Sequence, residues 1–202
     1  MKRLLAALIA LTVIFNLFSC NDESREYDES EVLFAAERLI RRSEDLNEIY
    51  WGRGIIYEEN LSYSNGYYYP AAPEHLLELG FFTIEEMKEK TRETFSASYC
   101  ENIFSTSLSF VGEDEIEGYA RYYQGLETIM VYSKYLAFLK DEVLYDYDTL
   151  SVLKSKGEYV IVKISAEVKR GDKSQTREIE ISLIEEKDGW KIDTPTYMSY
   201  QE

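Results

Sequence analysis

The chain has 202 residues and a formal net charge of −16 at pH 7, with 38 acidic against 22 basic side chains. A surface this acidic repels the phosphate backbone, so no nucleic-acid partner is expected. The length is sufficient for one domain with a substantial core. The unusual excess is tyrosine, at 18 residues.

The first 19 residues have the three parts of a secretory signal peptide. Met1-Lys2-Arg3 is a short basic start, Leu4 to Phe15 is an almost unbroken apolar run, and Ser19 is a small residue at the end. A membrane-spanning helix needs roughly 20 consecutive apolar residues. The run is shorter than that and is followed by a strongly polar segment, which favours the signal peptide.

The four residues Leu17-Phe18-Ser19-Cys20 resemble the bacterial lipobox, in which a lipid is joined to the cysteine thiol and the chain is cut just before it. The resemblance implies that Cys20 carries two or three acyl chains, enough for stable anchoring in a lipid bilayer. We therefore expect a mature lipoprotein on the extracytoplasmic face of the cell membrane. Residues 20–30 then form the lipidated cysteine and a flexible acidic tether, and residues 31–202 form a single domain.

With Cys20 lipidated, Cys100 has no cysteine partner. It lies in line with Ala97 and Phe104 at helical spacing, which predicts a small buried hydrophobe rather than a reactive thiol. His75 is the only histidine in the chain, and the sequence gives no support for a catalytic pairing of Cys100 with a histidine.

Three helices are expected in the first half. The first has one buried stripe, the second begins with a capping box in which Thr83 and Glu86 cap each other, and a third, shorter helix begins after Ser96. The stripe of the first helix, which ends at Gly52 and Gly54, consists of Val32, Ala35, Ala36, Leu39, Ile40, Ser43, Leu46 and Tyr50.

Between the first two helices, Gly54 to Phe81 is expected to be irregular and rich in aromatic residues. Loops of this length are often functional, and tyrosine supplies amphipathic contact area at low entropic cost. The alternative, that some of these rings only fill the core beneath the loop, stays open. The predicted partner-binding residues are Tyr57, Tyr63, Tyr67, Tyr68 and Tyr69.

The second half is predicted to be antiparallel strands. Residues 119–123 and 128–132 are expected to pair about Gln124-Gly125, and residues 132–143 fit either a strand or a helical turn. Apolar and polar residues then alternate over 160–168 and 179–183, with turns at Arg170-Gly171-Asp172 and Asp188-Gly189. Trp190 is expected to pack on the sheet or on the first helix. Helices followed by a meander predict an α+β fold, with the helices packed on one face of a curved antiparallel sheet.

This order of elements, ending in Glu186-Lys187-Asp188-Gly189-Trp190-Lys191-Ile192-Asp193, resembles the nuclear-transport-factor-like cone superfamily over roughly residues 30–197. That superfamily includes ketosteroid isomerase, many binding domains and secreted bacterial lipoproteins. The order is also similar to secreted inhibitors of cell-wall DL-endopeptidases. The first resemblance implies a pocket between the curved sheet and the helices.

Two aspartates are candidate carboxylates of such a pocket. Asp146 and Asp148 share a strand face with Leu150 and Val152 by period two, so one could point inward; the alternative is a solvated strand start, and a bulge would exchange the two faces. Asp146-Tyr147-Asp148 begins like a calcium loop, but Ser151 stands where that loop needs glycine. No metal and no cofactor are expected.

The sequence thus favours a non-catalytic binding module tethered at the cell envelope, with a protein or a cell-wall component as partner. The alternatives are an inhibitor of cell-wall hydrolases, a small-molecule pocket enzyme of the ketosteroid-isomerase type, and a structural accessory of an envelope complex.

Overall fold

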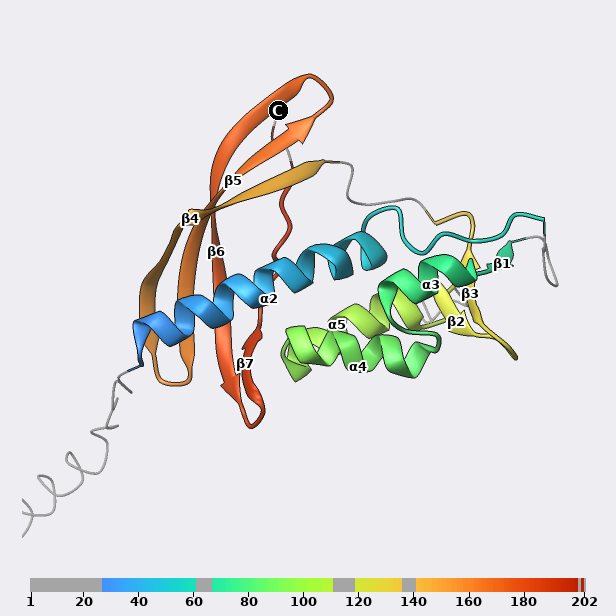
Figure 1. Ribbon diagram of the computed structural model, residues 1–202, viewed down its shortest axis with the longest axis horizontal. Helices are drawn as coiled ribbons and strands as arrows, with labels where there is room; N and C mark the ends of the chain where they lie inside the picture. Colours follow the sequence, from blue (N-terminus) through green and yellow to red (C-terminus); the bar gives the residue numbers. More distant parts are fainter. Residues whose placement is uncertain (1–26, 61–66, 111–118, 136–140, 200, 202) are drawn as a thin grey trace, which may run out of the picture.

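The computed structural model describes residues 27–60, 67–110, 119–135, 141–199 and 201. The strands form a four-stranded antiparallel meander in the order β4-β5-β6-β7 and a small antiparallel sheet in the order β1-β3-β2 (Figure 1). The elements in chain order are α2 (Glu29–Tyr50), β1 (Tyr68–Pro70), α3 (Pro73–Leu79), α4 (Ile84–Thr94), α5 (Ala97–Leu108), β2 (Tyr122–Gln124), β3 (Ile129–Tyr132), β4 (Glu142–Lys156), β5 (Tyr159–Arg170), β6 (Lys173–Glu186) and β7 (Gly189–Ile192).

Helix α2 lies across one face of the large sheet. Helices α4 and α5 lie beside the C-terminal half of α2, and α3 and the small sheet lie beyond its C-terminal end (Figure 1). All eight apolar-stripe positions expected from the sequence are buried. The side chain of Asp28 caps the helix by accepting from the amides of Ser30 and Glu31. The ring of Tyr27 meets the ring of Trp190 edge-on at 5.0 Å. Packing therefore begins at Tyr27, within the stretch expected to be a tether.

The large sheet confirms the predicted meander. On β5 the buried residues alternate strictly with half-exposed ones, and on β6 Ile181 and Leu183 point the same way. Trp190 and Ile192 on β7 are buried, as expected. One apolar face of the sheet and the stripe of α2 form a continuous core. The predicted α+β class, with helices on one face of an antiparallel meander, is confirmed.

The predicted capping box at α4 is also present. Thr83 Oγ1 accepts from the Glu86 amide at 3.2 Å, and the Glu86 carboxylate accepts from the Thr83 amide at 3.1 Å. Ser96 caps α5 through an accepted bond from the Tyr99 amide. The third helix was expected to be shorter than the second, but α5 has 12 residues and α4 has 11. Cys100 is buried on α5, as predicted.

The stretch from Gly54 to Phe81 is less irregular than expected, because it contains β1 and the short helix α3. Pro73 occupies the first turn of α3, where its missing amide hydrogen costs nothing, and Gly80 ends the helix at a φ of +71°. Both residues are local sequence signals for the start and the end of a short helix, and the expectation of an irregular segment did not use them. The pairing of β2 with β3, across Gly125, is as predicted.

Candidate binding surface

The segment from Gly54 to Pro73 leaves the end of α2 and returns alongside itself. The Glu58 amide donates to the Pro70 carbonyl at 3.0 Å, and the Ala72 amide donates to the Ile56 carbonyl at 2.8 Å. An isolated bridge joins Tyr57 and Ala71 between these bonds. The two arms are therefore held as a narrow hairpin, which β1 continues into the small sheet.

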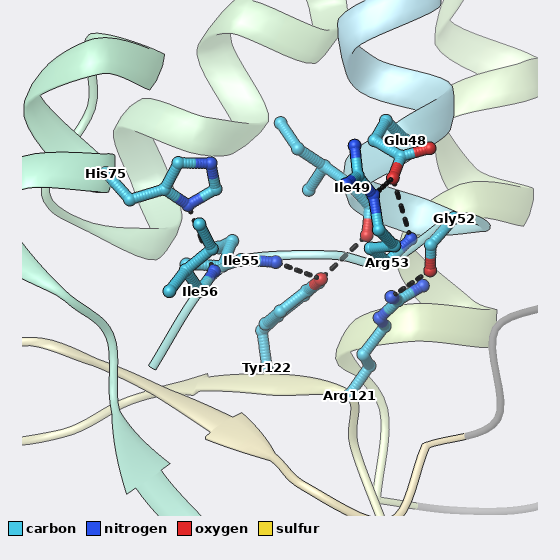
Figure 2. Close-up of polar contacts among 9 residues, drawn as sticks. All are labelled: Glu48, Ile49, Gly52, Arg53, Ile55, Ile56, His75, Arg121 and Tyr122. Atoms are coloured by element: carbon cyan, nitrogen blue, oxygen red, sulfur yellow. Dashed lines mark hydrogen bonds and ion pairs between the residues drawn. The ribbon is translucent and has the colours of Figure 1, made fainter. Parts of the chain in front are cut away.

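The base of this hairpin is fixed by side chains from β2 and the residue before it (Figure 2). Arg121 donates to the carbonyl oxygens of Tyr50 and Gly52, at 2.5 and 2.6 Å. Tyr122 donates through its hydroxyl to the Ile49 carbonyl at 2.7 Å. The last carbonyls of a helix have no intrahelical partner, so these bonds cap α2 from outside the helix.

Two further contacts in Figure 2 hold the first arm of the hairpin. The Ile55 amide donates to the Tyr122 hydroxyl at 3.2 Å, and the Ile56 amide donates to Nδ1 of His75 at 3.0 Å. The single histidine of the chain thus has a structural contact to the hairpin backbone. Arg53 turns the other way and donates to Glu48 at 2.7 Å.

Six aromatic rings gather over the small sheet, and we call them the aromatic cluster. Tyr119 and Tyr132 stack nearly parallel at 4.8 Å, and Tyr68 meets Tyr123 edge-on at 4.8 Å. The remaining contacts between ring centroids lie between 5.4 and 6.5 Å. The members of the aromatic cluster are Tyr67, Tyr68, Phe110, Tyr119, Tyr123 and Tyr132.

Tyr68 is the internal anchor of this cluster. It is 4% exposed, and its hydroxyl donates to the Ala120 carbonyl at 2.8 Å. Burial, with smaller contributions from the neighbouring tyrosines, raises the pKa of Tyr68 to about 12. A hydroxyl with that pKa stays protonated at neutral pH, so Tyr68 keeps the proton that it donates to the Ala120 carbonyl.

Three other rings of the cluster are open to solvent: Tyr67 is 40% exposed, Phe110 44% and Tyr119 52%. Further exposed apolar side chains lie at the same end of the molecule. Among the described residues, seven of the eleven exposed large hydrophobic side chains come from this region, namely Ile56, Tyr67, Leu77, Phe82, Phe110, Tyr119 and Leu126. Apolar area gathered in this way is typical of an interaction surface.

The five tyrosines predicted to bind a partner fall into three groups by their position in the structure. Tyr67 and Tyr68 belong to the aromatic cluster: Tyr67, just before β1, is exposed, and Tyr68, the first residue of β1, is buried. Tyr69 stacks on Tyr57 at 5.2 Å, and both are half-buried, so they join the two arms of the hairpin. Tyr63 lies outside the described residues.

Sequence reasoning missed the other four members of the cluster. Phe110, Tyr119, Tyr123 and Tyr132 come from parts of the chain that the pairing of β3 with both β1 and β2 brings together. The available signal was the expected pairing about Gly125, which places Tyr123 and Tyr132 in one small sheet.

Asp146 and Asp148 do not lie in a pocket. Both are exposed on β4, whereas Tyr145 and Tyr147 face the core. The pairing of β4 with β5 shifts between Asp146 and Ser151, so the inward face changes from the tyrosines to Leu150 and Val152. Of the two possibilities that the sequence left open, the exposed position is the one that both aspartates occupy, and the bulge explains why they do not share a face with Leu150 and Val152.

Two structural findings concern the described part of the chain alone. There, no group of three or more His, Cys, Asp or Glu side chains is placed to hold a metal ion. No helix of the described residues is long and apolar enough to span a membrane. No protein-family model matches the chain, and a search of curated proteins finds no significant match.

Proposed function

We propose that this chain is a non-catalytic binding module, held at the outer face of the bacterial cytoplasmic membrane by a lipid on Cys20, that grips an envelope protein with its aromatic cluster. The observation that carries the proposal is the concentration of exposed apolar side chains around that cluster. Tyrosine and phenylalanine rings are rigid and large, and such residues dominate the energetics of many interfaces.

The position of the cluster suits a tethered module. The tether joins the chain at the N-terminal end of α2, and the small sheet lies beyond the C-terminal end of the same helix (Figure 1). A helix of 22 residues spans about 33 Å at 1.5 Å per residue. The exposed rings are therefore separated from the proposed anchor by the length of α2, which leaves them accessible to a large partner.

The architecture supports rigid presentation of the rings. Arg121 and Tyr122 lock the base of the hairpin to α2, and Tyr68 locks β1 into the small sheet. A preorganised surface loses less conformational entropy on binding than a flexible loop does. The partner we expect is a protein with an apolar depression and a basic rim, because the net charge of this chain is −16.

The test is photo-crosslinking from position 67 in intact cells, followed by binding measurements with the purified crosslinked partner. We expect Tyr67→Ala and Tyr119→Ala each to weaken that binding by ~2 kcal/mol, the range of interface anchors. The control is Tyr159→Ala, an equally exposed tyrosine on β5. Tyr68→Ala is unsuitable, because Tyr68 is a buried anchor. Unchanged affinity in both test variants, with native melting curves, would remove the aromatic cluster as the contact surface.

The anchor has its own test. Cys20→Ala is expected to abolish incorporation of a labelled fatty acid and to move the protein out of the lipid-anchored fraction, because the thiol that receives the lipid is gone. The matched control is Cys100→Ala, which removes the other cysteine of the chain. Equal labelling of the wild type and the Cys20 variant would contradict the lipoprotein assignment and leave the aromatic-cluster test unaffected.

A further inference from the structure

A cavity of about 190 Å³ opens between the second half of α2, the start of β4 and the C-terminal tail. It shares no residue with the aromatic cluster. Its volume is below the range of roughly 300–1,000 Å³ typical of sites for whole small molecules, so it fits a single chemical group or side chain. The described residues that line it are Glu44, Asn47, Glu48, Asp141, Glu142, Val143, Tyr145 and Tyr197.

Asn47 is 7% exposed, and a chain of buried hydrogen bonds fixes the orientation of its carboxamide. The Ile40 carbonyl can only accept, so Ser43 Oγ donates to it, at 2.7 Å. Ser43 Oγ therefore accepts from Thr196 Oγ1 at 2.7 Å, and Thr196 Oγ1 accepts from Asn47 Nδ2 at 2.8 Å. One N–H of the amide is thereby used. Asn47 lines the cavity, and its oxygen, which has no hydrogen-bond partner among the described residues, is an acceptor available there.

Four of the other residues of the lining are acidic, and their carboxylates are also acceptors. Two of these carboxylates are already paired. Glu48 accepts from Arg53 at 2.7 Å, and Asp141 accepts from Arg170 at 2.6 Å. These two ion pairs leave Glu44 and Glu142 as the further sources of negative charge in the lining.

Glu44 accepts a hydrogen bond from the Tyr147 hydroxyl at 2.6 Å, and Arg41 lies over the ring of Tyr147 at 3.7 Å. Glu142 is exposed and has no ion-pair partner among the described residues. The guanidinium of Arg41 offsets part of the charge of Glu44, and Lys169 stands opposite Glu142 on β5, where it offsets part of the charge of that carboxylate. The described lining itself contains four carboxylates and no lysine or arginine, so it offers acceptors and no cation to a ligand.

Two aromatic rings complete the lining. Tyr145 and Tyr197 contribute ring surface, and neither hydroxyl has a hydrogen-bond partner among the described residues. Trp51 packs against Tyr197 with 6.1 Å between ring centroids, which supports that ring from behind. The face of a phenol ring carries partial negative charge and attracts cations.

We infer that this cavity binds an alkylammonium group. An ammonium group has three donors and no acceptor, which complements an amide oxygen and carboxylates. Its alkyl stem would pack along the tyrosine rings, as lysine stems do on apolar surfaces. The same chemistry occurs in a free aliphatic diamine and in a lysine side chain of a polypeptide. The inference does not depend on the aromatic cluster or on lipidation.

The test is a titration of the isotope-labelled protein, followed by nuclear magnetic resonance, with three probes. Cadaverine represents a free amine, Nα-acetyl-lysine methylamide represents a side chain, and Nα-acetyl-norleucine methylamide has the same stem without the charge. We expect both amines, but not the norleucine probe, to shift the carboxamide signal of Asn47 and the signals of Tyr145. The tighter of the two amines identifies the source. Equal shifts with the norleucine probe, or no shifts with any probe, would overturn the inference.

Charge-neutralising variants locate the site. Glu142→Gln and Glu44→Gln preserve shape, and each is expected to weaken amine binding by about tenfold, as for loss of a charge-assisted contact. The control is Glu89→Gln on α4, an exposed residue outside the lining that undergoes the same loss of charge. If all three variants weaken amine binding to the same extent, the binding follows net charge and the cavity is not the site. If none of them weakens it, the cavity is likewise not the site.

Discussion

At Gly54 the chain turns out of α2 with a φ of +84°. That conformation is cheap for glycine and strained for every residue with a Cβ. The space is also closed, because an added Cβ would meet Arg121 Nη2 and would lie 2.5 Å from the Tyr122 hydroxyl. The same two side chains cap α2 and hold the hairpin, so Gly54 permits the close approach on which the candidate surface depends.

Gly54→Ala is expected to lower the free energy of unfolding by ~2–4 kcal/mol, from backbone strain plus displacement of Arg121 and Tyr122. The matched control is Gly171→Ala. Gly171 also has a positive φ, of 58°, but nothing lies within 4 Å of an added Cβ, so we expect a cost of ~1 kcal/mol there. Urea unfolding of both variants measures the difference. Equal losses would mean that the contacts to Arg121 and Tyr122 contribute nothing.

Cys100 is a residue whose environment was predictable. Helical spacing predicted burial, and its Sγ lies 3.6 Å from the Phe95 carbonyl in the core. Burial raises the pKa of the Cys100 thiol to about 11. Arg121 was not predictable, because nothing local distinguishes a buried helix-capping arginine from an exposed one; its partners lie about 70 positions away in the chain.

At the scale of elements, local signals determine what could be foreseen. The α2 stripe, the α4 capping box and the β5 alternation each depend on spacings of a few residues, and all three are present in the structure. The bulge in β4 could be considered but not located, because Thr149 creates it through partners on two strands. Its hydroxyl donates to the Asp146 carbonyl and accepts from the Ser165 amide.

The capping box of α4 gives a prediction at this scale. Thr83→Ala removes the side-chain acceptor for the Glu86 amide, and the expected loss of stability is ~1 kcal/mol. The control is Thr106→Ala in the exposed interior of α5, where the hydroxyl bonds to the Asn102 carbonyl of the same helix. Alanine is the better helix former there, so little change is expected. Thermal unfolding of the two variants measures the difference. Equal shifts of the melting temperature would show that the cap contributes no more to stability than the helix propensity of the substituted residue does.

At the scale of the molecule, one long helix connects the large sheet with the small sheet, and all three contribute to one hydrophobic core. The N-terminal part of the helix packs on the large sheet, and its C-terminal end is capped by residues beside the small sheet (Figure 1). The sequence predicted the large sheet and its packing on α2, because this part of the core comes from long periodic elements. It predicted only two of the six rings of the aromatic cluster, because β1 and β2 are three residues each and their convergence is set by long-range pairing.

The tyrosine content gives the whole molecule a characteristic response to alkali. Burial raises the pKa of Tyr122 to about 12 and that of Tyr68 to about 12, from an ordinary value of 10.0. Burial is also the leading cause of raised pKa values at five more tyrosines. They are Tyr50, Tyr99, Tyr145, Tyr147 and Tyr197.

A group whose pKa is higher in the folded state stabilises that state fully below the unfolded pKa, and the stabilisation is lost as the pH rises through the folded pKa. Unfolding free energy should therefore fall as the pH rises from 10 to 12, with a loss of about 2 kcal/mol from Tyr122 alone at the upper limit. Urea unfolding across that range, with tyrosinate absorbance followed in parallel, measures it. Tyr122→Phe should start less stable, because it loses the bonds to Ile49 and Ile55. It should nevertheless fall less steeply with pH, and a slope equal to that of the wild type would contradict the assignment of the loss to this buried hydroxyl.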